Sequence, residues 1–413
     1  MAESDNLAHK IEQTLPAELV GFMQNAGKLA AGRGEKLYLV GGAVRDLLLN
    51  YGNLDIDLVV EGDAITLAEE LHADGKITRH RRFNTAKFDW HGYSIDIATA
   101  RRESYAHPGA LPTVRPGCLE DDLIRRDFTI NAMAASLAPD DYGRLIDPYS
   151  GRKDLEGTRL RILHLKSFID DSTRIWRGLR YEQRLDFRLE AQTLRLLKRD
   201  VPMLDTVSGD RIRYELECVL KEAHPEKVLR RAGELGVLVR LEPSLKGNDI
   251  LADRFHQARE LYSSGRPLLG LYFALLTYDI YDEARERLIY YLKLNKTITG
   301  TLRGAAAIKS KMAKLADASL KPSAIYHLLE GYSTQALTAG LIAAGSAIAE
   351  QHIGLYVDKL RTVKPLLTGD DLIRLGVPQG PRIKEVLGRL LEARLDGRAI
   401  TREDEERLVK ELA

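Results

Sequence analysis

The sequence predicts an α+β fold class: a head with a mixed sheet in roughly the first 165 residues, followed by helices alone. Two observations lead to this prediction. Short runs rich in β-branched and aromatic residues, bounded by Gly, Asn or charges, are concentrated before about residue 165. After about residue 166, nearly every segment has helical periodicity and ends at a short turn with Pro, Gly or Asn.

The expected strands of the head are residues 36–40, 55–61, 87–90, 93–99 and 160–164. Helical periodicity lies between and beside them, at residues 43–50 and 64–71. In the second part, helices are expected at residues 212–223, 227–235 and 383–396. We divide the chain into a head (1–165), a helical neck (166–225), a helical body (226–300) and a helical tail (301–413).

The composition is that of a folded protein without a strong global charge. With 413 residues, 44% hydrophobic and 29% charged, the chain has room for two or three domains and is not disordered overall. Its 61 basic and 60 acidic residues give a net charge of +1, so nucleic-acid binding would need local basic patches. Two distant cysteines, Cys118 and Cys218, exclude a disulfide scaffold or zinc finger and fit a reducing cytoplasm.

No targeting or membrane segment is expected. The first residues, MAESDNLAHKIEQTL, are acidic and polar, unlike a secretory signal. Apolar stretches such as residues 268–276 fall far short of the roughly 18–20 residues that a membrane helix needs. We therefore expect a cytoplasmic protein with no membrane partner.

The first motif is Leu-Val-Gly-Gly-Ala-Val-Arg-Asp at residues 39–46, a predicted strand that leads through two glycines into a helix. Without side chains, Gly41 and Gly42 let a backbone approach an anion closely, and the helix start presents free N–H groups. Arg45, one turn into the helix, can add a full charge toward a phosphate. A Gly-Gly pair before a helix can also be a simple turn.

The second motif is Asp55-Ile56-Asp57, which places two carboxylates at i and i+2 on one face of an apolar strand. Two such groups repel each other and are costly to desolvate. Mg²⁺ would remove this problem, because it is held by one or two carboxylates together with substrate phosphates. The alternative is a pair of surface aspartates. Asp96, on another predicted strand, could be a third acid or a polar edge residue, so we leave it out of the metal site.

The third motif is Arg-Arg-Asp-Phe-Thr-Ile-Asn-Ala at residues 125–132. Its polar residues suit a triphosphate and a ribose, while the Phe and Ile would anchor a helix in the core; a helix cap with solvated charges is the alternative. The fourth motif places Asp171 and Arg174 at i and i+3 on a predicted helix, with Arg177 and Arg180 at the same spacing. By themselves, these four could be an intrahelical ion pair with solvated arginines.

These motifs occur in the order and spacing of a known family. Together with Asp147-Pro148, Gly151 and Asp154-Leu155, residues 36–190 resemble the bacterial tRNA nucleotidyltransferase and poly(A) polymerase family, the class II branch of the polymerase-β-like nucleotidyltransferases. Residues 369–397 also resemble the tail of bacterial CCA-adding enzymes. The resemblance implies a polymerase-β-like nucleotidyltransferase head.

The resemblance also implies roles for particular residues. Asp55 and Asp57 would bind the catalytic Mg²⁺, and Gly42, Arg45 and Arg126 would bind the incoming nucleotide. Asp171 and Arg174 would select the base, and the nucleotide pocket would further include Arg177 and Arg180.

The chemistry of the bases supports this selection. Cytosine and adenine present an amine donor beside a ring-nitrogen acceptor, so a carboxylate and an arginine match them. Guanine and uracil have the reverse polarity and would be rejected. One departure is Asp170, which stands where the family commonly has Glu.

Two further segments concern RNA and the choice of nucleotide. Residues 101–112 contain two prolines and a glycine and are expected to be an ordered but mobile loop. In the family, a flexible loop at this position is linked to switching from C to A addition, and enzymes that add only C have a shortened loop. The presence of the loop in this chain argues against a CC-only enzyme. The alternative is a connecting loop without a role in catalysis.

Residues 293–321 contain seven basic residues and one acid, a pattern that suits RNA phosphates or a solvated helix face. The basic cluster at residues 79–82 is a weaker candidate.

The sequence thus predicts a Mg²⁺-dependent enzyme that adds CCA to the 3′ end of tRNA from CTP and ATP without a nucleic-acid template. The nearest alternative is an A-adding enzyme or a poly(A) polymerase, which share the head motifs. An alternative of another class is a non-catalytic RNA-binding protein on the same fold, in which the paired carboxylates would be lost. The sequence does not indicate an oligomeric state.

Overall fold

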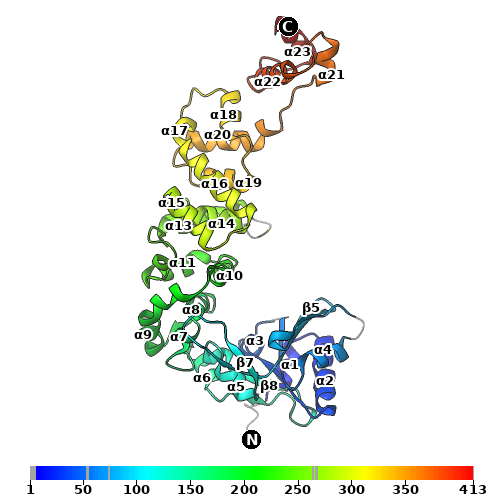
Figure 1. Ribbon diagram of the computed structural model, residues 1–413, viewed down its shortest axis with the longest axis vertical. Coiled ribbons are helices and arrows are strands. Elements are labelled where there is room, and N and C mark those ends of the chain that lie inside the picture. The colour runs from blue at the N-terminus through cyan, green and yellow to red at the C-terminus, as the bar shows by residue number, and fades with distance from the viewer. Residues whose placement is uncertain (1–5, 53–54, 73–74, 263–264, 266–267, 413) are drawn as a thin grey trace. The chain divides into compact units, whose positions relative to one another are not determined.

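The computed structural model describes residues 6–52, 55–72, 75–262, 265 and 268–412 (Figure 1). The chain forms two compact units, residues 1–215 and 216–413, which we describe separately. The boundary falls inside the expected neck. The finer division into head, neck, body and tail therefore stays a prediction.

Unit 1 is built on a seven-stranded mixed sheet with the order β3-β4-β5-β2-β1-β8-β9. Its strands are β1 (Lys36–Val40), β2 (Asp55–Glu61), β3 (Thr78–His80), β4 (Thr85–Trp90), β5 (Tyr93–Thr99), β8 (Ala134–Ser136) and β9 (Leu145–Ile146). Strands β2 and β5 are parallel, and their register sets Asp57 opposite Asp96. The other pairs within the described sheet are antiparallel.

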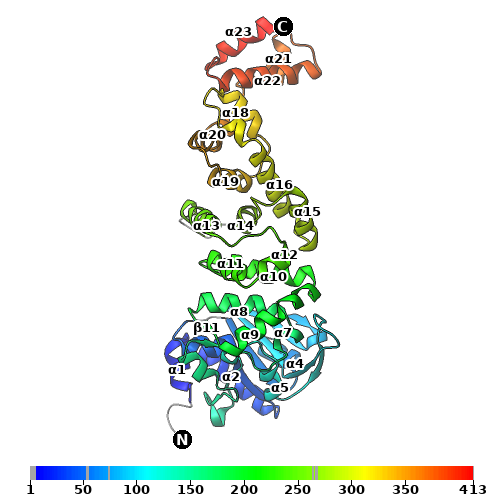
Figure 2. The same cartoon turned by 90° about the vertical axis from the view of Figure 1, so that its left-hand side faces the viewer.

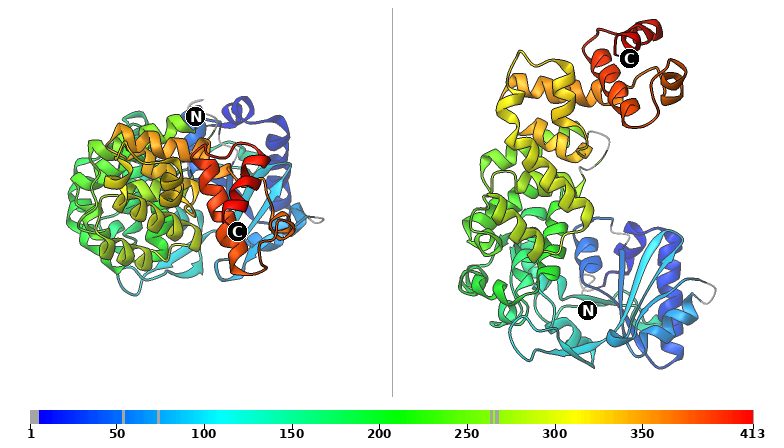
Figure 3. Two further views of the ribbon diagram at one scale, coloured as in Figure 1. Left: turned by 90° about the horizontal axis from the view of Figure 1, so that it is seen from above. Right: turned by 45° about the horizontal axis from the view of Figure 1, so that its top comes forward.

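The two faces of this sheet are covered differently. One face packs on helices α1 (Ala8–Thr14), α2 (Ala17–Gly32), α3 (Gly42–Leu48) and α4 (Ala64–Leu71), as the blue helices beside the sheet in Figure 3 show. The other face carries a smaller core with α5 (Leu119–Ile124). Because residues alternate along a strand, Ile56 and Leu58 of β2 point to the larger core, and Val59 points to the smaller one. Asp55 and Asp57 share the face of Val59, and both are exposed.

The rest of unit 1 consists of two small sheets and a group of helices. The sheets are the antiparallel pair β6 (Arg101–Ser104) with β7 (Thr113–Pro116) and the parallel pair β10 (Arg159–Leu160) with β11 (Arg188–Leu189). The helices are α6 (Gly151–Glu156), α7 (Ser167–Asp170), α8 (Thr173–Arg184), α9 (Ala191–Asp200) and α10 (Gly209–Leu220), which crosses the unit boundary.

The strands expected at 36–40, 55–61 and 93–99 are confirmed to the residue, and β4 begins two residues before the expected 87–90. The expected strand at 160–164 is wrong. Its partner β11 has only two residues, so the pairing ends at Leu160, and Arg161 turns away to bind Asp154 at 2.7 Å. Residues 101–104 are a strand of the β6–β7 pair, not part of a loop. The helix expected at 43–50 ends at Leu48.

Unit 2 is helical throughout the part that the structure describes (Figure 2). Its helices are α11 (Pro225–Glu234), α12 (Val237–Leu241), α13 (Asp249–Leu261), α14 (Leu269–Leu276), α15 (Asp282–Tyr291), α16 (Lys296–Ser310), α17 (Met312–Leu315), α18 (Pro322–Leu329), α19 (Thr334–Ile342), α20 (Ala347–Asp358), α21 (Gly369–Arg374), α22 (Pro381–Leu395) and α23 (Arg402–Leu412). The helices expected at 212–223, 227–235 and 383–396 are therefore present as α10, α11 and α22, each beginning two or three residues earlier.

The apolar run at 268–276 forms α14, which is buried from Gly270 to Leu276 inside unit 2. Among the described residues, no helix is both long and apolar enough to cross a membrane. The last three helices enclose a small core of their own, which includes Leu372 and Leu390. Both cysteines are free thiols, as expected.

Candidate active site

The turn between β1 and α3 requires glycine at Gly41. Its φ of +69° lies in the left-handed region, which favours glycine. A Cβ on Gly41 would also lie 2.6 Å from Nη1 of Arg126, so the arginine rests directly on the turn. Gly42 is the first residue of α3, and its open side faces the cavity described below. The glycine turn before α3 and the third motif are thus brought together.

Replacing Gly41 with Ala should disturb this contact. Both the positive φ and the close approach of Arg126 oppose a Cβ, so we expect a loss of about 1–3 kcal/mol of stability and a kcat/KM for nucleotide at least about tenfold lower. Steady-state kinetics and thermal unfolding measure both effects. Gly34→Ala is the matched control, because Gly34 has a φ of +74° but nothing within 4 Å of its Cβ position. It should lose stability and keep activity; equal losses of activity in both variants would contradict the argument.

Arg45 is buried at 4% exposure and is held from three sides. Its Nε donates to Asp46 at 2.8 Å, its Nη1 donates to Oδ1 of Asn131 at 2.7 Å, and the guanidinium lies 5.4 Å from the ring centre of Tyr181. Asn131 belongs to the third motif. Residues Thr129–Asn131 of this motif form a short 3₁₀ turn, not the expected helix. A buried, fully oriented arginine presents a fixed charge to a ligand.

The same chain of contacts continues through the third motif. Nδ2 of Asn131 donates to Asp127 at 2.9 Å, and Nη2 of Arg177 lies 2.9 Å from the other oxygen of Asp127. Burial alone would raise the pKa of Asp127, but Arg177 and these hydrogen bonds hold it below its ordinary value. The glycine at position 178 allows helix α8 to approach, because a Cβ there would lie 2.9 Å from the ring of Phe128. Arg45 and Arg177 are thereby fixed in one network.

The acidic pair of β2 lies at the beginning of the strand, where both side chains are exposed. Asp57 faces Asp96 across the parallel pair, and Asp96 is bound by Nζ of Lys87 at 2.6 Å. Although its side chain stays open to solvent, the surrounding protein raises the pKa of Asp57, with Asp96 and Asp55 adding to the rise and Arg126 opposing it. Two hard carboxylate ligands with excess negative charge fit a divalent cation. Among the described residues, no cluster of three or more acidic, His or Cys side chains suited to a metal occurs.

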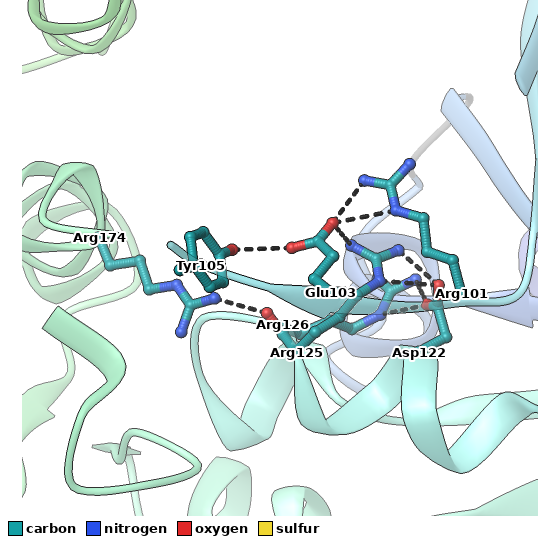
Figure 4. Close-up of polar contacts among 7 residues, drawn as sticks. All are labelled: Arg101, Glu103, Tyr105, Asp122, Arg125, Arg126 and Arg174. Carbon is teal, nitrogen blue, oxygen red and sulfur yellow. Dashed lines mark hydrogen bonds and ion pairs between the residues drawn. The ribbon is translucent and has the colours of Figure 1, made fainter. Parts of the chain in front are cut away.

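Glu103 and Asp122 orient the two arginines of the third motif (Figure 4). Asp122 is fully buried and binds Arg125 through Oδ1 and Arg126 through Oδ2, the latter at 2.8 Å. Burial alone would raise the pKa of Asp122, but Arg126 and Arg125 keep it lowered. Oε1 of Glu103 accepts from Arg101 at 2.8 Å and from Arg125 at 3.2 Å, and its other oxygen accepts from the Tyr105 hydroxyl at 2.8 Å. Strand β6 is therefore tied to the end of α5.

The fourth motif is not a ladder on one helix. Asp171 has an extended backbone, with φ of −142°, between α7 and α8, and only Arg174 and the later arginines lie on α8. The reason is that Asp171 acts at the helix start, where its carboxylate accepts from the backbone N–H and hydroxyl of Thr173. Arg174 is buried and donates to Ser167 and to the carbonyl oxygen of Arg125, each at 2.6 Å. The two side chains are therefore positioned independently of each other.

Glu215, on α10, is a buried carboxyl near the arginines of α8. Its exposure is 6%, and burial raises its pKa from 4.5 to about 7, against the opposing charges of Arg177 and Arg180. Asp171 and Asp127 add to the rise. No local pattern indicates Glu215, because it lies more than thirty positions from Arg177 and Arg180.

The pKa of Glu215 predicts a dependence of stability on pH. Because the pKa in the folded protein, about 7, lies above the ordinary 4.5, the unfolded chain ionises first as the pH rises. This difference lowers the free energy of unfolding by on the order of 3 kcal/mol as the pH rises from 4.5 to 7. Glu215→Gln should match the wild type near pH 4.5 and be more stable at pH 8, as measured by urea unfolding. Parallel pH profiles of the two proteins would contradict this.

These residues surround one cavity of about 700 Å³ in unit 1. Among the described residues, eight arginines and four carboxylates line it. Seven of the nine residues singled out in the sequence are among its lining residues, namely Gly42, Arg45, Asp57, Arg126, Asp171, Arg174 and Arg177. Asp55 and Arg180 are not, although Asp55 lies on the same strand face as Asp57, and the Arg180 guanidinium lies 4.9 Å from the ring centre of Tyr181.

The sequence did not reveal several other residues of the cavity. Arg101, Glu103 and Tyr105 alternate at i, i+2 and i+4, which would have placed them on one face had residues 101–104 been recognised as a strand. Arg184, four residues after Arg180 on α8, also lines the cavity. Arg211 pairs with Asp171 across forty positions, which no local pattern could indicate.

In unit 2, several cations of the basic stretch at 293–321 are bound within the protein. Arg303 pairs with Glu286 at 2.7 Å, Lys309 with Asp279 at 3.2 Å, and Lys311 donates to a backbone carbonyl at 2.8 Å. The free charge of this stretch is therefore smaller than its sequence suggests. Within 79–82, Arg79 pairs with Glu69 at 2.7 Å. Contact of either segment with RNA stays a prediction.

The chain resembles known proteins of one family. Residues 37–161 match the family described as "Poly A polymerase head domain", and residues 186–247 match "Probable RNA and SrmB- binding site of polymerase A". A protein of Halalkalibacterium halodurans, named A-adding tRNA nucleotidyltransferase, is 34% identical over 93% of this chain and 90% of its own length. The chain belongs to the tRNA nucleotidyltransferase family. It is therefore a member of an enzyme family, and the family resemblance stated from the motifs is confirmed.

Two more tRNA nucleotidyltransferases define the range of the similarity. A protein of Geobacter sulfurreducens, also named A-adding tRNA nucleotidyltransferase, is 36% identical over 98% of this chain, which spans 48% of that relative's length. The structure of a Thermotoga maritima CCA-adding enzyme complexed with tRNA has a TM-score of 0.79 and 31% identity, with 98% of each chain covered. The predicted fold class, a mixed-sheet nucleotidyltransferase head followed by helices, is thereby confirmed.

Proposed function

We propose that this tRNA nucleotidyltransferase completes the CCA end of tRNA by adding CMP and AMP from CTP and ATP, without a nucleic-acid template. The observation that carries the proposal is the arginine-rich cavity beside the acidic pair of β2. Eight arginines against four carboxylates suit a triphosphate, which carries about four negative charges near neutral pH. The Thermotoga maritima relative, a CCA-adding enzyme complexed with tRNA, supports tRNA as the acceptor.

In this proposal, the residues divide between the triphosphate and the base. Gly42 and the start of α3, with Arg45 and Arg126, hold the phosphates. Asp171 accepts a hydrogen bond from the exocyclic amine of cytosine or adenine, and Arg174 donates to the neighbouring ring nitrogen. Arg177 and Arg180 complete the pocket on the side of α8. Guanine and uracil would place donor against donor and acceptor against acceptor at this edge.

Asp55 and Asp57 would hold Mg²⁺, which when bound lowers the pKa of the attacking hydroxyl and neutralises developing charge. The terminal 3′-hydroxyl of the tRNA attacks the α-phosphate of the nucleotide in line, the new phosphodiester bond forms, and pyrophosphate leaves. The described side chains do no covalent chemistry. Arg45 and Arg126, held by their carboxylate and amide partners, keep the triphosphate in position as the charge shifts.

A second candidate is addition of the final A alone. The names of the Geobacter and Halalkalibacterium relatives favour it, because both are A-adding enzymes. The two activities need the same head, so the pocket residues do not separate them.

An assay with two tRNA substrates tests both candidates. One tRNA lacks the whole CCA end, and the other lacks only the final A; each is incubated with labelled CTP or ATP and Mg²⁺. CCA addition predicts CTP incorporation on the first tRNA and ATP incorporation on the second; ATP is incorporated on the first tRNA only when unlabelled CTP is also present, because the two C residues must precede the A. An A-adding enzyme would label only the second tRNA, with ATP, and labelling of neither would refute the proposed function. A ladder of many A residues would indicate a poly(A) polymerase.

A further inference from the structure

The cavity of unit 1 extends from Asp57 toward the outer strands of the sheet. The register places Thr85 of β4 on the sheet face of Asp57, and His80 of β3 lies opposite Thr85. Phe83 belongs to the short 3₁₀ turn Arg81–Phe83, which connects β3 to β4 and which we call the β3–β4 turn. His80, Phe83 and Thr85 line the cavity together with Asp57. The β3–β4 turn is therefore part of the cavity wall.

The β3–β4 turn and the glycine turn before α3 lie on opposite sides of β2. In the sheet order β3-β4-β5-β2-β1, strands β5 and β4 follow β2 on one side, and β1, which leads into α3, borders it on the other. In the proposed function, Arg45 and Arg126 hold the triphosphate beside α3. An in-line displacement requires the attacking hydroxyl opposite the leaving pyrophosphate. The end of the acceptor RNA should therefore enter from the side of β5 and β4.

Phe83 offers an aromatic ring to this side of the cavity. The ring is half-buried, and the guanidinium carbons of Arg82 and Arg101 lie 5.3 Å and 5.5 Å from its centre. Aromatic side chains in single-stranded RNA sites stack on bases, and such stacking accepts any base because every base has a π-face. An aromatic ring beside two guanidinium groups has the chemistry of a site for one nucleotide of an RNA end.

The cations of the β3–β4 turn differ from those deeper in the cavity because they are not neutralised by the protein. Arg177, for example, lies 2.9 Å from the buried carboxylate of Asp127. Arg81 and Arg82 are exposed, and neither forms an ion pair with any residue that the structure describes. Exposed arginines without carboxylate partners suit the phosphodiesters of RNA, which they can bind without regard to sequence.

We propose that Phe83 and Arg82 bind the 3′-terminal nucleotide of the acceptor RNA. The ring of Phe83 packs against the terminal base, and the guanidinium of Arg82 contacts the phosphodiester that precedes it. The inference rests on the proposed function, in which a tRNA end attacks the nucleotide. It gives part of the basic cluster at residues 79–82 a defined ligand. Because these contacts are made to the acceptor, their loss should weaken acceptor binding and leave the binding of CTP and ATP unchanged.

Variants of the full chain test this assignment with a tRNA that lacks only the final A. Phe83→Leu keeps an apolar side chain without a ring and should raise KM for this tRNA by roughly 5- to 50-fold, with KM for ATP unchanged. Phe83→Trp keeps a stacking surface and should stay near the wild-type KM. Arg82→Gln should reduce the slope of log affinity for tRNA against log salt by about one. Tyr51→Leu is the matched control, since Tyr51 is an exposed aromatic residue of unit 1 that does not line the cavity.

Photocrosslinking without nucleotide gives a second readout, which separates this inference from the proposed function. A tRNA that lacks the final A and ends in 5-iodocytidine should crosslink to Phe83 on irradiation, as mapped by mass spectrometry, and Phe83→Leu should lose the crosslink. If wild-type protein transfers no nucleotide, the proposed function fails, yet the crosslink still reports on Phe83. The inference alone is overturned if the wild type transfers AMP but its crosslink maps outside residues 80–85. It is also overturned if Phe83→Leu and Tyr51→Leu change KM for tRNA equally.

Discussion

Replacing Asp57 with Asn should lower kcat for nucleotide transfer at least about 1000-fold while tRNA binding stays near the wild-type level. Asn is neutral, and a neutral amide is a poor substitute for a carboxylate as a ligand of a hard divalent cation. Asp57 lines the cavity, shares a strand face with Asp55 and lies opposite Asp96, so three carboxylates gather here. Burial, with a smaller contribution from Asp96 and Asp55, raises the pKa of Asp57. Single-turnover assays and filter binding of tRNA measure the two effects.

Asp89→Asn is the matched control, because Asp89 lies on β4, which β5 separates from β2, and accepts a hydrogen bond from the backbone N–H of Gly92 at 3.0 Å. It should transfer nucleotides at the wild-type rate. Removal of divalent cations with EDTA should abolish transfer by the wild type, and added Mg²⁺ should restore it. Transfer by Asp57→Asn at more than a few per cent of the wild-type rate would remove Asp57 from the reaction.

Replacing Asp171 with Asn should weaken the preference for CTP over UTP at least about 100-fold. The amide oxygen can keep the place of Oδ1, where Thr173 and Arg211 donate to it. The amide NH₂ then stands where Oδ2 stood, so a donor replaces the acceptor that faces the base. The amide NH₂ can donate to O4 of uracil, but it faces the cytosine amine as a second donor. The two binding free energies should therefore differ by a few kcal/mol.

Incorporation of each of the four nucleotides by this variant measures the change. Asp170→Asn is the control, since Asp170 lies next to Asp171 in sequence but belongs to α7, where its carboxylate is 3.9 Å from the His164 ring. Its nucleotide preference should stay within about threefold of the wild type. An Asp171→Asn variant that keeps its selectivity and loses only its rate would show that Asp171 positions the substrate without reading the base.

The sequence was most informative where local periodicity and side-chain chemistry agree. Strand β2 and the shared face of Asp55 and Asp57 could be predicted, because alternation along a strand requires no knowledge of the partner strands. The glycine turn before α3 could also be predicted, and Gly41 has the positive φ that such a turn needs. The motifs of the head occur in the order typical of one family, and the match of residues 37–161 to the head domain of that family confirms the resemblance.

The sequence was less informative where contacts between residues far apart in the sequence determine the local structure. Residues 160–164 have the composition of a strand, but the two-residue partner β11 limits the pairing. Asp171 was placed on a helix because its spacing to Arg174 is helical, although Asp-Ser-Thr is also typical of a helix start. The contacts of Arg211 and Glu215 depend on how α10 packs in unit 1, which no periodicity specifies.

The pairing of Arg125 and Arg126 with Asp122 has a consequence for repeated turnover. Because these guanidinium groups are already oriented by a buried carboxylate, the entropic cost of ordering them is met during folding and, in the proposed function, not at each encounter with a nucleotide. The same carboxylate cancels part of their charge, so a released pyrophosphate is held less firmly than by bare arginines. Preorganisation and partial neutralisation together suit an enzyme that must empty its pocket between successive additions.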